Sequence, residues 1–198
     1  MKKKLFVFVP IFLVFILIFT IITPVVAMSE NVSDKIFRLH ILANSDSIED
    51  QDLKLKVRDR VLMLTEDMYV ECNTVDDAIE ITKKNLGAIE NIAQKVVCFY
   101  GYEYDVEAYV SREYFNTRVY DDFVMPAGMY DCLKIEIGEA KGHNWWCVMF
   151  PSVCISGCSD ELSDVLTEEE YELVSSGKYI VRFKIIEVYE GLKSKIIS

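Results

Sequence analysis

The sequence predicts an α+β fold, in which helices pack on one face of a small, mostly antiparallel sheet. Residues 36–42 alternate between apolar and polar side chains, and two stretches over about 49–70 and 74–98 then repeat apolar residues at helical spacing. After Gly101 the alternating period of strands returns and continues to about residue 150. A strand, two helices and a run of strands are typical of a sheet whose helices are segregated to one side.

The first strand is predicted by the alternating segment at 36–42. Successive side chains of a strand point to opposite faces. The apolar residues therefore share one face, while Arg38 and His40 share the other. The polar run NSDS at 44–47 ends the strand and supplies helix-capping side chains.

Two helices follow the first strand. Ser47 and Asp50 have the spacing of a capping box at the start of the first helix, and Thr74 with Asp77 caps the second. The inward-facing apolar residues of the first helix are predicted to be Leu53, Val57, Val61, Leu64 and Met68.

The second half of the chain is predicted to be a meander of three antiparallel strands. Segments 102–110 and 130–137 alternate, 145–150 has the pattern of a buried strand, and 113–120 is a further strand candidate. Polar residues 138–144 predict a hairpin loop between the last two, and Pro151 ends the last strand. Beyond it we expect a loop at 156–166, a short acidic helix at 167–176 and a further helix at 178–194.

The N-terminus has the pattern of a secretory signal. Residues 1–4 are basic, an apolar run extends to Ile22, and small or β-branched residues lead to Ala27. The run of about eighteen residues also approaches the length of a membrane span, so a cleaved signal peptide and an uncleaved anchor both remain open. In either case residues 28–198 form a single exported α+β domain, with 156–198 as a C-terminal helical extension, and only the leader contacts the membrane.

Charge narrows the possible partners. The chain has 21 basic and 32 acidic residues. Its first 27 residues hold three lysines and no acid, so the exported part has 18 basic residues and a net charge of −14. Such a surface repels the phosphates of nucleic acids, so we expect no nucleic-acid partner. Residues 54–60 add a local basic cluster, for which a solvated helix face is the alternative interpretation.

The six cysteines permit disulfides if the protein is exported. Cys147 and Cys154 bracket Pro151, and we predict that they are bonded to each other. A zinc site built from His143, Cys147, Cys154 and Cys158 matches no common ligand spacing, so neither a metal nor any other cofactor is predicted.

Candidate binding residues gather in two segments, the end of the first strand with its turn and the loop before the tryptophan pair. They are the polar and aromatic groups that core packing explains least: Arg38, His40, Asn44, Asp46, Ser47, His143, Asn144 and Trp145. We expect the two segments to lie near each other and to contact a partner, with Trp146 on the opposite strand face in the core. The alternative is that the strand end only caps a helix and carries a half-solvated face.

No set of residues indicates catalysis. His143, Asn144 and the nearby cysteines do not form a plausible nucleophile and base, because the histidine and asparagine are neighbours in one loop. No GxSxG elbow is present, and the paired acids have no distinguishing spacing. We therefore expect a binding or signalling protein rather than an enzyme.

Two blocks of the sequence resemble the stage II sporulation protein R family. The first is FRLHILANSDS at 37–47 with QDLKLKVRD at 51–59, and the second is MPAGMYDCLKIEIGEAKGHNWWCVMFPSVC at 125–154. The resemblance implies a signalling protein made in the forespore and secreted into the space between the forespore and mother-cell membranes. It implies that the partner is a membrane-embedded aspartic protease, which on activation processes pro-sigma E in the mother cell. A secreted cell-wall hydrolase or glycan-binding module, with the tryptophan pair as a sugar platform, is the alternative.

Overall fold

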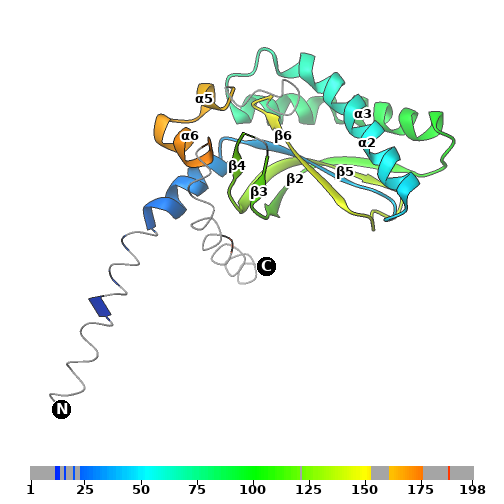
Figure 1. Ribbon diagram of the computed structural model, residues 1–198. Helices are drawn as coiled ribbons and strands as arrows, with labels where there is room; N and C mark the ends of the chain where they lie inside the picture. The colour runs from blue at the N-terminus through cyan, green and yellow to red at the C-terminus, as the bar shows by residue number, and fades with distance from the viewer. Residues whose placement is uncertain are drawn as a thin grey trace, which may run out of the picture.

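The computed structural model describes residues 12, 13, 16, 20, 23–120, 122–152, 161–175 and 187. In this part of the chain an α+β domain is built around a four-stranded sheet, as the sequence predicts. The elements in chain order are β1 (Phe37–Leu42), α2 (Ile48–Tyr69), α3 (Val75–Phe99), β2 (Val106–Phe115), β3 (Arg118–Val119), β4 (Val124–Met125), β5 (Gly128–Ile137), β6 (Asn144–Phe150), α5 (Glu161–Val165) and α6 (Glu168–Ser175). Figure 1 shows α2 and α3 side by side over one face of the sheet.

The strand order β2-β5-β1-β6 corrects the predicted meander. β1 lies between β5 and β6, parallel to the former and antiparallel to the latter, so the loop at 138–143 crosses the end of β1 and does not close a hairpin. The physical reason is that β1 is buried along nearly its whole length. A strand covered on both faces belongs in the middle of a sheet, where both of its edges find hydrogen-bond partners.

β2 is one strand where the sequence predicts two. It pairs with β5 without interruption from Val106↔Ile137 to Phe115↔Gly128. α3 holds the chain where it enters β2, because Gln94 donates to the Tyr104 carbonyl at 2.8 Å and accepts from the Val106 amide at 2.9 Å.

The larger core lies between the sheet and the two long helices. It takes alternate residues from each strand, including Leu39, Leu133 and Met149, and the inner residues of α2 and α3. Both predicted helices are confirmed, and Thr74 and Asp77 form the expected capping box. At the start of α2, Ser47 accepts from the Asp50 amide at 3.1 Å, but the Asp50 carboxylate is bound elsewhere, so the reciprocal half of the predicted box is absent.

A second core covers one part of the opposite face. Residues 23–33 are helical, and Val32 is buried there with Ile36. α5 replaces part of the loop expected at 156–166, and α6 is the acidic helix expected at 167–176. The predicted helix at 178–194 lies outside the described residues except for Glu187, as does most of the predicted leader.

Candidate functional site

The strand-end turn and the loop before β6 meet at one end of the sheet, as predicted. The amide of Gly142 donates to the Ala43 carbonyl at 2.9 Å, and the amide of Glu139 donates to Asn44 Oδ1 at 3.0 Å. Asp46 Oδ1 accepts from the His143 amide at 2.6 Å and also contacts His143 Nδ1. We call the surface formed by Asn44, Asp46, Ser47, His143 and Asn144 the turn–loop corner.

Two glycines allow the close approach in this corner. Gly138 has φ +60°, and a Cβ there would collide with the Asn44 side chain. A Cβ at Gly142 would collide with the Ser45 carbonyl. Sequence reasoning did not single out these glycines, although a glycine at each end of a short polar loop is a signal of unusual backbone geometry.

The buried side chain of Asp50 fixes the strand-end turn by hydrogen bonds to Asn44 and Ser45. Burial opposes its ionisation, but hydrogen bonds from Ser45 Oγ at 2.5 Å and Asn44 Nδ2 at 2.9 Å outweigh that effect and lower its pKa. Lys54, from the next turn of α2, donates to the His143 carbonyl at 2.7 Å. The first turns of α2 therefore fix the positions of both segments of the turn–loop corner.

Below the corner, His40 is the centre of a polar network on the sheet face that α2 and α3 leave uncovered. Its Nδ1 lies 2.7 Å from Glu113 Oε2, and its Nε2 lies 2.6 Å from Asn144 Oδ1. The ring stacks on Trp146, with centroids 4.7 Å apart. His40 thus links three strands, and its burial corrects the expectation that this side chain is available to a partner.

Lys134 completes this network from β5. Its ammonium lies 3.0 Å from a carboxylate oxygen of Glu113 and 3.0 Å from one of Glu136. Burial disfavours both charges, but the pairing prevails: hydrogen bonds from Lys134 and His40 lower the pKa of Glu113, and hydrogen bonds to Glu113 and Glu136 raise the pKa of Lys134. No sequence signal distinguishes these residues, because they lie on alternating strand positions typical of a solvated face.

Arg38 is also buried, with 0% of its surface exposed, which corrects its predicted place at a surface. Its guanidinium carbon lies 4.3 Å from the centre of the Phe115 ring and 4.9 Å from that of Tyr130, and Nη2 donates to Tyr120 Oη at 2.8 Å. A planar, weakly hydrated cation stacks well between aromatic rings. Arg38 therefore joins the second core to β1 and does not face solvent.

The two tryptophans lie on opposite faces of β6, and neither is fully exposed. Trp145 packs against the helix-side core, with the Arg58 guanidinium carbon 4.3 Å from the centre of its ring. Trp146 packs against the second core and makes an edge contact with Phe115, the centroids 4.3 Å apart. Both faces of the strand are covered, and the two rings do not form one platform.

Cys147 lies in the helix-side core and is disulfide-bonded. Its predicted partner, Cys154, lies outside the described residues, so the pairing itself stays a prediction. Cys72, Cys98 and Cys132 are free thiols, and burial raises the pKa of Cys132 to about 11. A buried thiol with a raised pKa is a poor nucleophile.

The arrangement presents hydrogen-bonding groups that a partner could contact. Within the described ranges, no three His, Cys, Asp or Glu side chains are grouped so that they could hold a metal ion. The exposed part of the site is the turn–loop corner, which carries hydrogen-bonding groups on a backbone held by α2 and two glycines. None of the described helices is long and apolar enough to cross a bilayer.

Comparisons with known proteins identify the family. The chain is 32% identical to the stage II sporulation protein R of Bacillus subtilis (strain 168) over 139 residues, which are 70% of this chain and 61% of that protein. No solved structure is significantly similar to this chain. The model of the family described as "Stage II sporulation protein R (spore_II_R)" matches residues 33–160, a range that includes the sheet, both long helices and the turn–loop corner. The chain therefore belongs to the stage II sporulation protein R family.

Proposed function

We propose that this protein is an exported signalling ligand that activates a membrane-embedded aspartic protease and so triggers the processing of pro-sigma E in the mother cell. The observation that carries the proposal is the family match over residues 33–160. In this proposal the protein acts in the space between the forespore and mother-cell membranes, and its leader delivers it there. The leader either remains as an anchor or is removed near Ala27, a position that falls within helical residues 23–33.

The turn–loop corner is the surface that we assign to the receptor. Asp46, Ser47 and His143 are exposed, while the backbone beneath them is fixed by buried groups. A preorganised surface binds with a smaller loss of conformational entropy than a flexible loop. Arg38 and His40 are buried and are not assigned to the receptor contact. They support it indirectly, because Arg38 fixes β1 and His40 positions Asn144.

A glycan-binding role receives no support from this geometry. A sugar platform needs an accessible aromatic face, whereas Trp145 and Trp146 lie on opposite faces of β6 and pack against separate cores.

Co-expression in a non-sporulating host tests the proposal. The full chain is produced with the candidate protease and its pro-protein, and cleavage of the pro-protein is scored. We expect cleavage only when all three are present and when this chain is exported. Replacing Leu13, Phe15 and Leu17 with charged residues should retain the chain in the cytoplasm and abolish cleavage. Absence of cleavage with exported wild-type protein would overturn the proposed activity.

The receptor surface is tested in the same assay with a double variant, Asp46→Asn with His143→Ala. We expect loss of cleavage while export and melting temperature stay at wild-type values. The matched control is Lys84→Ala, which removes a similarly exposed ion-pairing side chain from α3, where Lys84 lies 2.8 Å from Glu80. Full cleavage with a folded, exported double variant would exclude the turn–loop corner as the contact.

A further inference from the structure

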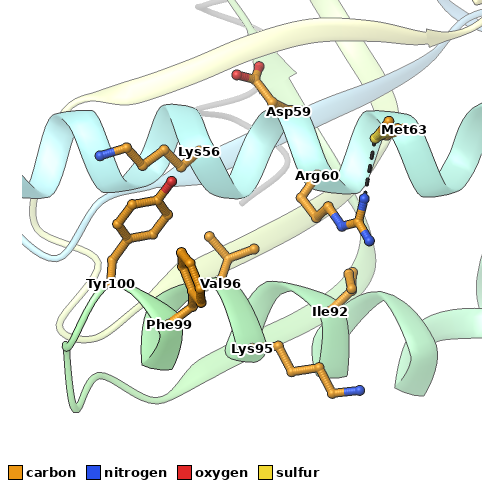
Figure 2. A pocket seen from close by; sticks show the side chains of 9 residues that line it. All are labelled: Lys56, Asp59, Arg60, Met63, Ile92, Lys95, Val96, Phe99 and Tyr100. Carbon is orange, nitrogen blue, oxygen red and sulfur yellow. Dashed lines mark hydrogen bonds between the residues drawn. The ribbon is translucent and has the colours of Figure 1, made fainter.

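A groove of about 550 Å³ lies between α2 and α3, and none of the residues that line it belongs to the turn–loop corner. Figure 2 shows side chains from both helices converging on it. We propose that this groove is a second binding surface, and that it takes an acidic amphipathic helix of a partner protein. The proposal concerns binding alone and does not depend on protease activation.

The first observation is the apolar surface that this groove leaves in solvent. Phe99 is 82% exposed, Met63 is 61% exposed and Tyr100 is 45% exposed. Val96 and Ile92 form the adjoining wall from α3. Exposed large apolar side chains that cluster along one groove are typical of an interaction surface, whereas the same residues scattered singly are not.

The second observation is the charge around this apolar surface. Lys56, Arg60 and Lys95 line the groove in a chain whose net charge is −11. Within the part of the chain that the structure describes, no carboxylate lies within ion-pair distance of Arg60 or Lys95. The acid that lines the groove, Asp59, is already paired with Arg58 at 2.5 Å. The groove is therefore a local basic site with two cations available to a partner.

The lining residues run along both helices, from Lys56 to Met63 on α2 and from Ile92 to Phe99 on α3, and this course suits a helical occupant. Two neighbouring helices leave a linear groove, and an amphipathic helix fills such a groove with side chains spaced at i, i+3, i+4 and i+7. Acidic residues flanking that apolar stripe would meet Arg60 and Lys95, while the acidic remainder of this chain repels wrongly oriented partners.

Segments of this chain are poorer candidates for the groove. The acidic helix α6 already buries Leu173 and Val174, so its apolar face is used. Residues 176–198 contain five basic and two acidic side chains. Their net positive charge has the same sign as that of the groove, so the two repel each other. A bilayer is also a poor occupant, because the overall negative charge of the chain opposes its approach to anionic lipid.

The test uses the full chain held in nanodiscs of phosphatidylcholine. The probe is a fluorescent synthetic helix of roughly 18 residues, with leucines at i, i+3, i+4 and i+7 and glutamates beside them. A matched peptide carries glutamine in place of each glutamate. We expect saturable binding of the glutamate peptide by fluorescence anisotropy and at least roughly tenfold weaker binding of the glutamine peptide.

Variants of the groove locate the binding. Phe99→Ala should reduce the affinity for the glutamate peptide about thirtyfold, as truncation of a binding hot spot does. Arg60→Glu with Lys95→Glu should weaken it by at least roughly tenfold. The control, Lys84→Glu with Lys141→Glu, makes the same change in net charge on exposed side chains elsewhere and should leave affinity within about twofold. No binding, or equal loss in the control, would overturn the proposal.

Oxidation of Met63 by peroxide distinguishes a partner helix from lipid and from a second copy of this chain. An exposed methionine is oxidised readily, whereas a covered one is protected. Bound peptide should protect Met63. Protection without peptide in nanodiscs that contain phosphatidylglycerol would assign the groove to lipid, and protection that rises with protein concentration would assign it to a second copy. Either result would overturn the proposal.

Discussion

The two faces of the sheet are stabilised in different ways, although every strand contributes alternate residues to both. The face under α2 and α3 is apolar and is covered along the length of the helices. The opposite face combines a smaller apolar core with Arg38, stacked on aromatic rings, and with the ionic network of His40, Glu113 and Lys134. Alternation along a strand therefore does not mean that the polar face is solvated.

The difference matters for the turn–loop corner, which both faces support. Lys54 reaches the loop backbone from the helix-covered side, and His40 reaches Asn144 from the other side. Changes that affect either face are expected to reach the surface that we assign to the receptor, so stability has to be measured beside signalling.

The largest effects on stability are expected for Leu39 and Arg38, adjacent residues of β1 that face opposite sides of the sheet. Leu39→Ala should reduce the free energy of unfolding by about 2–5 kcal/mol through loss of buried apolar volume. Arg38→Ala should cost about 3–5 kcal/mol, because it empties a buried site and removes the cation between two rings. Chemical denaturation measures both values.

The matched control for Arg38→Ala is Arg38→Met, which keeps the side-chain volume but removes the charge. It should restore at least about half of the stability that Arg38→Ala loses. An Arg38→Ala protein that unfolds at the wild-type denaturant midpoint would show that the polar face contributes little.

The disulfide of Cys147 restrains the helix-covered face of the edge strand β6. Cys147→Ser should reduce the free energy of unfolding by about 2–4 kcal/mol, and reduction of the wild type should have a similar effect. Cys98→Ser is the control, because Cys98 is an exposed free thiol. Mass mapping of the unreduced protein checks the predicted partner: a free thiol at Cys154 would refute that pairing.

The ionic network on the other face predicts a dependence on pH. The folded pKa of Glu113 lies below its ordinary value of 4.5, so its ionised form stabilises the fold above that value. This contribution is lost as pH falls through the folded pKa. Glu113→Gln should cost about 1 kcal/mol at pH 7, since solvent partly screens the pairs.

Denaturation from pH 7 to pH 3 measures the effect. The variant should lose less stability over that range than the wild type does. Glu107→Gln, an exposed position on the same strand, should follow the wild-type profile. Parallel profiles for Glu113→Gln and the wild type would show that the network does not couple folding to protonation.

The smallest effect on stability is expected at the turn–loop corner. Asp46→Asn and His143→Ala remove an exposed contact, and each should change the free energy of unfolding by about 0.5 kcal/mol or less. Thermal melts check this. A large loss of stability would mean that this contact supports the fold, and it would remove the basis for assigning a signalling defect to a lost receptor contact.

Local patterns in the sequence were sufficient for the elements that depend on near neighbours. The periods of α2 and α3, the caps at Ser47 and Thr74, and the split of β1 into two faces follow from residues within a few positions of each other. The meeting of the strand-end turn with the loop before β6 was also predicted, since each polar segment adjoins the end of a strand.

Only the tertiary structure decided which strands are neighbours and which polar residues are buried. β1 separates β5 from β6 because a strand covered on both faces is stable at the centre, and no local pattern distinguishes that position from an edge. Arg38 and His40 are buried because rings and carboxylates from distant segments surround them: Phe115, Tyr130 and Glu113. Whether a charge on a strand meets water or a partner depends on what covers that face, and segments far apart in the chain supply that cover.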